Sequence, residues 1–90
     1  MATLLVTYDL NRETKRPPML QAIKELANGN WAKLSESSYA IRTNLNAAQV
    51  LNALTPFIDQ NDNIYIINLK APWNGFGPQE VNAWLENALR

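Results

Sequence analysis

The apolar positions of the chain change their spacing several times, and each change marks a new structural element. Residues 3–9 begin as an apolar run and end at Asp9, as expected of a buried strand that breaks into a loop. After this loop, apolar residues recur at helical spacing and stop at Asn28-Gly29-Asn30, a typical helix end: Met19, Leu20, Ile23, Leu26 and Ala27. The pattern predicts a strand over residues 3–9 and a helix over residues 18–27.

Two short runs with strand character follow, at residues 31–35 and 38–43. In the second run, Tyr39 and β-branched residues alternate with Ala40 and Arg42, which is the period of a strand with two different faces. The runs are separated only by Glu36-Ser37, so we expect them to pair as a hairpin that turns there.

The second helix is recognised by its start. Asn46 followed three residues later by Gln49 resembles a capping box, in which each side chain bonds the backbone amide of the other residue. Pro56 should bend or end this helix. The pattern predicts a helix over residues 46–58, with Leu45 and Val50 as a hydrophobic staple and an inward stripe of Ala47, Val50, Leu51 and Leu54.

The last third of the chain holds a strand, a loop and a helix. Residues 64–69 are apolar on both faces and predict a strand. The following loop carries Trp73 and Gly75, and Pro78 suits the first turn of a helix. We predict this helix over residues 78–89, with one apolar stripe of Val81, Trp84, Leu85, Ala88 and Leu89.

The predicted elements follow each other in the order βαββαβ and then a further helix. Right-handed crossovers convert this order into a four-stranded antiparallel sheet with two helices on one face. The sequence therefore predicts an α+β fold, a ferredoxin-like βαββαβ plait with an additional C-terminal helix. We expect residues 1–90 to form this single domain.

The first and last strands are apolar at consecutive positions, at Leu4-Leu5-Val6 and over residues 64–67. A sheet with one solvated face should alternate apolar and polar residues instead. We therefore expect the face opposite the two helices to be covered as well, by the final helix or by a second subunit. A twofold homodimer is the common solution for so small a chain.

Composition and charge restrict the chemistry. Eight basic residues balance eight acidic ones, so the chain lacks the excess positive charge that drives non-specific binding to nucleic acid. It has no cysteine and no histidine, which excludes thiolate chemistry, Cys-based zinc sites and the usual general base near neutral pH. No apolar run is long enough to span a membrane, and no signal-type segment opens the chain, so we expect a cytoplasmic protein without a membrane partner.

The candidate chemistry lies at the end of the first strand. Asp9 is followed by Arg12, Lys15 and Arg16 in one loop. An acid beside cations suits a metal or phosphate site, and Asp9 is equally suited to cap a turn through its own following amides. The three basic residues are candidates for nucleic-acid binding, or a solvated loop that Glu13 interrupts.

Several short motifs occur along nearly the whole chain: Tyr8-Asp9-Leu10-Asn11, Ser37-Ser38-Tyr39, Asn44-Leu45-Asn46-Ala47-Ala48-Gln49, and the late Trp73 and Gly75. In these motifs the chain resembles the small CRISPR-associated adaptation nucleases, and more closely a CRISPR-independent, SinR-like branch of that superfamily.

This resemblance implies a homodimer in which Asp9 and its symmetry mate hold a divalent cation, Mg²⁺ or Mn²⁺, for phosphodiester cleavage. Two facing carboxylates with retained water and substrate phosphate approach the usual magnesium arrangement. The chain departs from the adaptation nucleases in two respects: it is neutral rather than basic, and residues 79–90 are predicted to be helical where those proteins commonly form a further strand.

Two hypotheses from different classes follow. The first is a metal-dependent endonuclease that acts on RNA or DNA through Asp9 of both subunits. The second is a non-catalytic dimer that binds nucleic acid or a partner protein, as a toxin-antitoxin-like or mobile-element protein. The position of Asp9 favours the first hypothesis, and the neutral charge favours the second.

Overall fold

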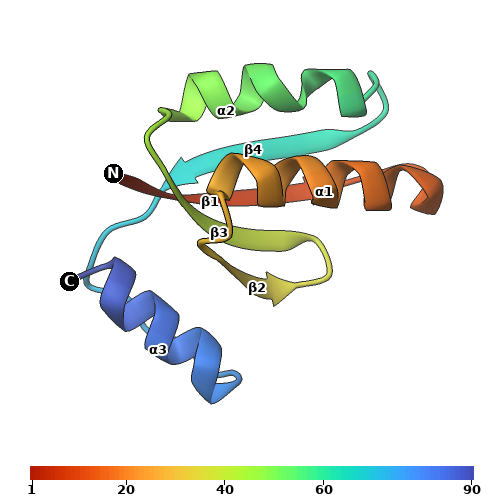
Figure 1. The fold of residues 1–90 in the computed structure, drawn as a ribbon. Coiled ribbons are helices and arrows are strands. Elements are labelled where there is room, and N and C mark those ends of the chain that lie inside the picture. Colours follow the sequence, from red (N-terminus) through yellow and green to blue (C-terminus); the bar gives the residue numbers. More distant parts are fainter.

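The computed structural model describes residues 1–90 and contains four strands and three α-helices (Figure 1). The strands are β1 (Ala2–Asp9), β2 (Trp31–Ser35), β3 (Ser38–Thr43) and β4 (Asn63–Asn68). The helices are α1 (Arg16–Ala27), α2 (Ala47–Leu54) and α3 (Gln79–Ala88). None of the helices is long and apolar enough to cross a membrane.

The strands form one sheet in the order β2-β3-β1-β4, and every neighbouring pair is antiparallel. β1 lies in the middle, so that Thr7 has Ser38 on one side and Tyr65 on the other. The α+β class, the four-stranded antiparallel sheet and the final helix predicted from the sequence are confirmed.

Local sequence signals explain where the helices begin and end. At the start of α2, the Asn46 side chain accepts from the Gln49 amide at 2.8 Å and the Gln49 side chain accepts from the Asn46 amide at 2.9 Å, which confirms the capping box. α1 ends at Asn28 and Gly29, whose φ angles of 49° and 84° lie in the left-handed region that ends helices. Pro56 lies in a 3₁₀ turn that follows α2 directly.

The main core lies between the sheet and the pair α1 and α2. Its β1 residues are at even positions, Leu4, Val6 and Tyr8, and its contacts from the helices include Met19, Ile23, Val50 and Leu54. The predicted inward stripe of α2 needs one correction, because Leu51 is 38% exposed. At 3.6 residues per turn, Ala47, Val50 and Leu54 share the core face and Leu51 lies at its border.

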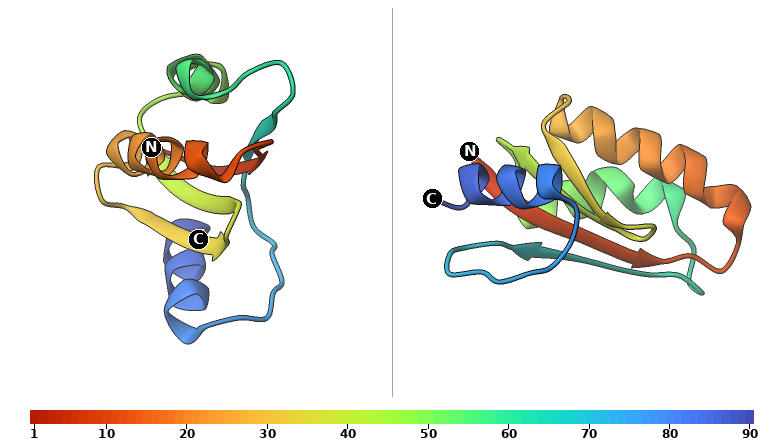
Figure 2. Two further views of the ribbon diagram at one scale, coloured as in Figure 1. Left: turned by 90° about the vertical axis from the view of Figure 1, so that its right-hand side faces the viewer. Right: turned by 90° about the horizontal axis from the view of Figure 1, so that it is seen from below.

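α3 packs on the opposite face of the sheet, away from α1 and α2 (Figure 2). Leu85 and Leu89 lie against Ala40, Thr3 Oγ1 donates to the carbonyl of Ala88 at 3.4 Å, and Trp84 Nε1 donates to Asn30 Oδ1 at 2.9 Å. This helix covers only part of the face. Along β4, Tyr65 remains 63% exposed and Ile67 remains 49% exposed.

The loop before α3 holds two aromatic residues with different surroundings. Trp73 packs against the small cluster beneath α3, whereas Phe76 is completely exposed. We call the uncovered part of the sheet, formed by Leu5, Thr7, Tyr65 and Ile67, the open face.

Candidate functional site

Asp9 ends β1 at one corner of the open face. Its side chain lies at an odd position of the strand, like Leu5 and Thr7, and therefore on the side opposite the main core. The residue is exposed and lies opposite Asn63 of β4. The carboxylate is thus accessible to a ligand or to another molecule that approaches this face.

The residues of two separate sequence motifs meet beside Asp9. The Tyr8 amide donates to the carbonyl of Ser37 at 2.9 Å, and the Tyr8 hydroxyl donates to the carbonyl of Glu36 at 3.2 Å. The hydroxyl groups of Thr7 and Ser38 are hydrogen-bonded at 2.9 Å. Burial, with the nearby Tyr39 as a further cause, raises the pKa of Tyr8 above its usual value. The Tyr8-Asp9 and Ser37-Ser38 motifs therefore form one corner of the sheet.

A shallow hollow of about 140 Å³ lies at this corner, lined by Thr7, Tyr8, Asp9, Asn63 and Tyr65. The oxygen atoms in this hollow that could bind a metal ion belong to one carboxylate, that of Asp9, and to hydroxyl and amide groups. No group of three or more acidic side chains gathers in the chain to hold a metal ion. Magnesium sites use carboxylates together with water and phosphate oxygens. One copy of the chain therefore offers half of the paired-carboxylate arrangement, and a second copy would have to supply the other Asp9.

The turn-cap hypothesis for Asp9 can be compared with the hydrogen bonds of the loop. A capping Asp bonds the amide two residues later, which here is that of Asn11. The Asn11 amide instead donates to Asp62 Oδ1 at 2.8 Å. The local backbone is thus bonded by a different acid, and the Asp9 carboxylate is left without this partner.

The three basic residues predicted to bind nucleic acid do not form a common cationic surface. Lys15 Nζ contacts Asp59 and Asp62 at 2.5 and 2.6 Å. Arg16 contacts Glu13 at 3.1 Å and Glu36 at 3.8 Å. Arg12 is exposed and forms no ion pair. Of the three basic residues, it is therefore the one whose positive charge is not paired with an acid and is available to a phosphate.

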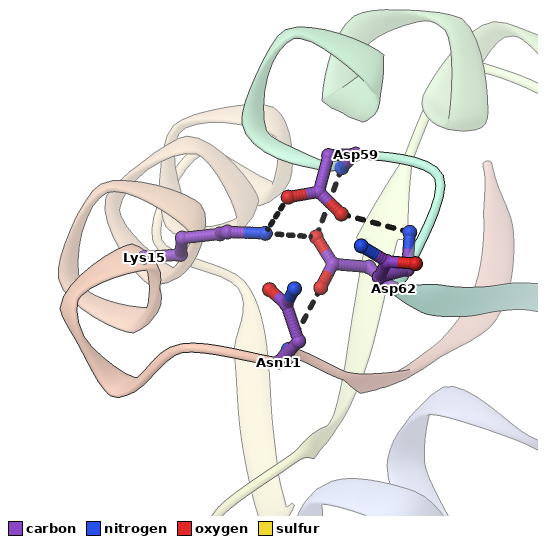
Figure 3. Close-up of polar contacts among 5 residues, drawn as sticks. Asn11, Lys15, Asp59 and Asp62 are labelled. Carbon is purple, nitrogen blue, oxygen red and sulfur yellow. Dashed lines mark hydrogen bonds and ion pairs between the residues drawn. The ribbon is translucent and has the colours of Figure 1, made fainter.

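Lys15, Asp59, Asp62 and Asn11 form the densest polar cluster of the molecule, which we call the acid clamp (Figure 3). The Asp62 side chain is fully buried and also accepts from the Asp59 amide at 2.9 Å. The clamp connects the loop after β1 to the loop before β4. These are the two chain segments that flank the Asp9 corner.

The ion pairs of the clamp change the ionisation of its members. The hydrogen bond from Lys15 lowers the pKa of Asp62 to about 2, and the backbone amides of Asn11 and Asp59 contribute in the same direction. Lys15 likewise lowers the pKa of Asp59. Partial burial lowers the pKa of Lys15, but its bonds to Asp59 and Asp62 outweigh this effect, so the net shift is upward.

The hydrophobic spacing did not predict the clamp, because residues 59–63 lie between the helix predicted over 46–58 and the strand predicted over 64–69. A usable signal was present, because two acids three residues apart precede the strand that pairs antiparallel with β1. Such pairing places the start of one strand beside the end of the other. The loop of Asp59 and Asp62 must therefore lie close to the loop of Lys15.

Comparison with known proteins found no family model that matches the chain and no curated protein that matches its sequence.

Proposed function

We propose that this chain is a ferredoxin-like plait that acts as a twofold homodimer, in which a second copy covers apolar side chains of β4 or of β1. The strand order β2-β3-β1-β4, with α1 and α2 on one face, supports the plait. The observation that carries the homodimer is the exposure of Tyr65 and Ile67 on the part of the sheet that α3 leaves uncovered.

The energetic reason is the cost of leaving these side chains in water. Apolar burial stabilises by roughly 25 cal/mol for each Å² removed from solvent, and a chain of this size buries a comparatively small fraction of its surface on folding. A neutral chain also offers no net repulsion between copies. Pairing of two copies therefore removes an exposed apolar strip without a charge penalty.

Sedimentation equilibrium at micromolar concentration tests the assembly. We expect the mass of a dimer for the parent chain. For Ile67→Lys, which places a charge in the open face, we expect a shift toward the mass of the monomer. Lys is tolerated at an exposed strand position, so circular dichroism should show an unchanged fold. A parent chain that sediments as a monomer would refute the proposal.

Phosphodiester cleavage through paired Asp9 residues is the second candidate. It is favoured by the free, exposed carboxylate of Asp9 on the same face and by the two motifs that meet around it. In a face-to-face dimer, Asp9 of both copies would hold Mg²⁺ or Mn²⁺, which supplies charge neutralisation at the phosphate and a more acidic bound water. Arg12 would then be the cation available to orient the phosphate backbone.

A cleavage assay with labelled RNA and DNA in Mg²⁺ or Mn²⁺ tests this candidate. We expect Asp9→Asn to abolish cleavage, because the amide keeps the shape and removes the charge that binds the cation. Glu86→Gln, an exposed acid on α3, is the matched control and should cleave like the parent chain. Absence of metal-dependent cleavage by the parent chain would leave the homodimer as a non-catalytic interaction module.

A further inference from the structure

The outer edge of β4 presents unpaired backbone groups. β4 is an end strand and has only β1 as a neighbour. The Leu69 amide donates to the Thr3 carbonyl at 2.9 Å, and the residues bonded to a given neighbour alternate along an antiparallel strand. Odd-numbered residues of β4 therefore bond β1, and Ile64, Ile66 and Asn68 direct their N–H and C=O groups outward.

This edge lacks the features that usually prevent strand addition. Proteins protect sheet edges with charged residues, prolines or bulges. The other edge strand, β2, has Lys33 and an irregular register between Lys33 and Ser35. β4 has the sequence Asn-Ile-Tyr-Ile-Ile-Asn, with no charge and no proline, and its register with β1 is uninterrupted.

β4 packs against α2, and both elements are uncharged; we call these two elements together the flank. Residues 43–58 and 63–69 contain no acidic or basic side chain. This flank also holds Leu51, Tyr65 and Ile67, which are three of the six large apolar side chains exposed on the molecule. A partner that covers the flank desolvates no ion, which removes the usual penalty for burying a charged surface.

The charged residues that flank β4 along the chain are opposite in sign at its two ends. Asp59 and Asp62 precede β4, whereas Lys70 follows it and forms no ion pair within the chain. In an antiparallel pair of identical strands, the start of each strand lies beside the end of the other. Each Lys70 would then approach the acidic end of the other copy, and a twofold axis produces this contact twice.

We propose that the second copy joins at this edge, so that β4 of the two copies pair antiparallel in one continuous sheet. This inference rests on the homodimer proposed above and places its contact at the edge of β4, with β1 outside the interface. A register centred on Ile66 pairs all three residues whose backbone groups point outward. In this register, Ile64 lies opposite Asn68 of the second copy. Tyr65 then lies opposite Ile67 of the second copy on the open face, as an aromatic and β-branched cross-strand pair.

The edge dimer differs from the face-to-face dimer in a way that experiments detect. Its twofold axis runs through the sheet, so both open faces lie on the same side and the two Asp9 carboxylates are separated by the paired β4 strands. A shared cation between the Asp9 residues requires the face-to-face arrangement instead. Backbone protection at β4 is therefore specific to the edge dimer.

Amide hydrogen exchange followed by NMR measures this protection directly. In the edge dimer, the amides of Ile64, Ile66 and Asn68 are hydrogen-bonded, so we expect their exchange to slow by at least about tenfold as the protein concentration rises through the dissociation constant. The amide of Tyr65, which already bonds β1, is the internal reference. A dimer whose three outward amides exchange at a rate independent of concentration would overturn the inference.

Two variants provide independent tests by sedimentation. Ile66→Pro removes an outward amide at a position where an edge strand accepts proline, and it should raise the dissociation constant about tenfold or more. Lys70→Glu leaves the core unchanged and should weaken the dimer at low salt, with recovery as added salt screens the repulsion. Lys24→Glu on α1 makes the same change of charge away from β4 and should leave the dissociation constant of the dimer unchanged.

A third variant separates failure of the edge contact from failure of the homodimer. Thr7→Lys introduces a charge on β1 within the open face and away from the β4 edge. Dimerisation lost in Thr7→Lys but retained in Lys70→Glu would refute the edge contact and leave the homodimer, joined through the open face. A parent chain that is monomeric at every concentration would refute both.

Discussion

Asp9 and Asp62 lie at the same end of the sheet, yet their carboxylates have opposite surroundings. The Asp62 side chain is buried and accepts hydrogen bonds from Lys15 and two backbone amides. Asp9 lies one strand away, exposed, without a bond to the amide that a capping Asp would use. The first acid stabilises the loops, and the second is available for a ligand. The two residues therefore respond differently to substitution and to pH.

The clamp should make stability depend on acid pH. The pKa of Asp62 is lowered to about 2 in the folded chain from an ordinary value of 3.8, so its contribution is present above about pH 4 and is lost as the pH falls toward about 2. The pKa of Lys15 is raised, so its contribution is complete below its ordinary value of 10.5 and is lost only above it.

Chemical denaturation between pH 2 and pH 7 measures this dependence. We expect Asp62→Asn to be less stable than the parent chain at neutral pH and to lose less of its stability on acidification, because it has no charge to protonate. Glu86→Gln, which removes an acid without an ion pair, should keep the parent's pH profile. Parallel profiles for Asp62→Asn and the parent chain would contradict the assignment.

Asp9→Asn distinguishes paired carboxylates from an isolated one. In a dimer that brings two Asp9 residues together, removal of their repulsion should raise the melting temperature in chelator. A turn cap predicts a lower melting temperature, and an isolated exposed carboxylate predicts little change. Thermal melts of both chains with EDTA and with Mg²⁺ measure the sign, and a decrease in EDTA would contradict the paired arrangement.

Several elements have a covered side and a side exposed to solvent or to a partner. α2 shows this most simply, because Leu54 is fully buried and Leu51, on the same helix, is 38% exposed. β1 directs even positions into the main core and odd positions toward the open face. The edge strands differ as well, because β2 has Lys33 and an irregular register whereas β4 has neither. Partner binding is therefore expected at β4 rather than at β2.

Leu54→Ala tests the core face of α2. We expect a loss of about 2 to 5 kcal/mol in the free energy of unfolding, as for other buried large-to-small substitutions. Leu51→Ala is the matched control on the same helix and should cost less than about 1 kcal/mol when measured on the monomer. Urea denaturation followed by circular dichroism provides both values, and a loss below about 0.5 kcal/mol for Leu54→Ala would mean that the core face is assigned wrongly.

At the scale of the whole molecule, the two faces of the sheet are covered unequally. α1 and α2 cover one face, and α3 covers only the part of the other face around Ala40. The remaining part, the open face, contains Tyr65 and Ile67 of β4, an edge strand without charge. An incomplete second layer of this kind is the physical reason to expect assembly.

Assembly predicts that stability depends on protein concentration. In a homodimer, the folded chain binds a second folded copy and the unfolded chain does not. The melting temperature should therefore rise with protein concentration. Calorimetry over a wide concentration range measures this shift, and Lys70→Glu should reduce it at low salt. A melting temperature that is constant over the range would indicate a folded monomer.

The sequence by itself determined the elements and their order. Hydrophobic spacing, the Asn46 and Gln49 capping box and the stop at Asn28-Gly29 are local signals, and the structure confirms the elements that they predicted. The antiparallel sheet also followed from element order, because crossover handedness leaves few topologies. Asp9 could be chosen as a candidate site residue because a carboxylate at the end of an apolar strand is a local feature of the sequence.

The tertiary structure decided which polar groups meet. Lys15 and the acids Asp59 and Asp62 are 44 and 47 residues apart, so their ion pairs depend on the pairing of β1 with β4 and have no periodic signature. The same pairing neutralised Lys15, one of the three cations that had suggested a nucleic-acid surface. It also placed Asp62 on the Asn11 amide, so that the Asp9 carboxylate has no bond to this amide. Spacing along the chain reports burial and local bonds, whereas the neutralisation of a charge depends on which distant side chain the fold brings within reach.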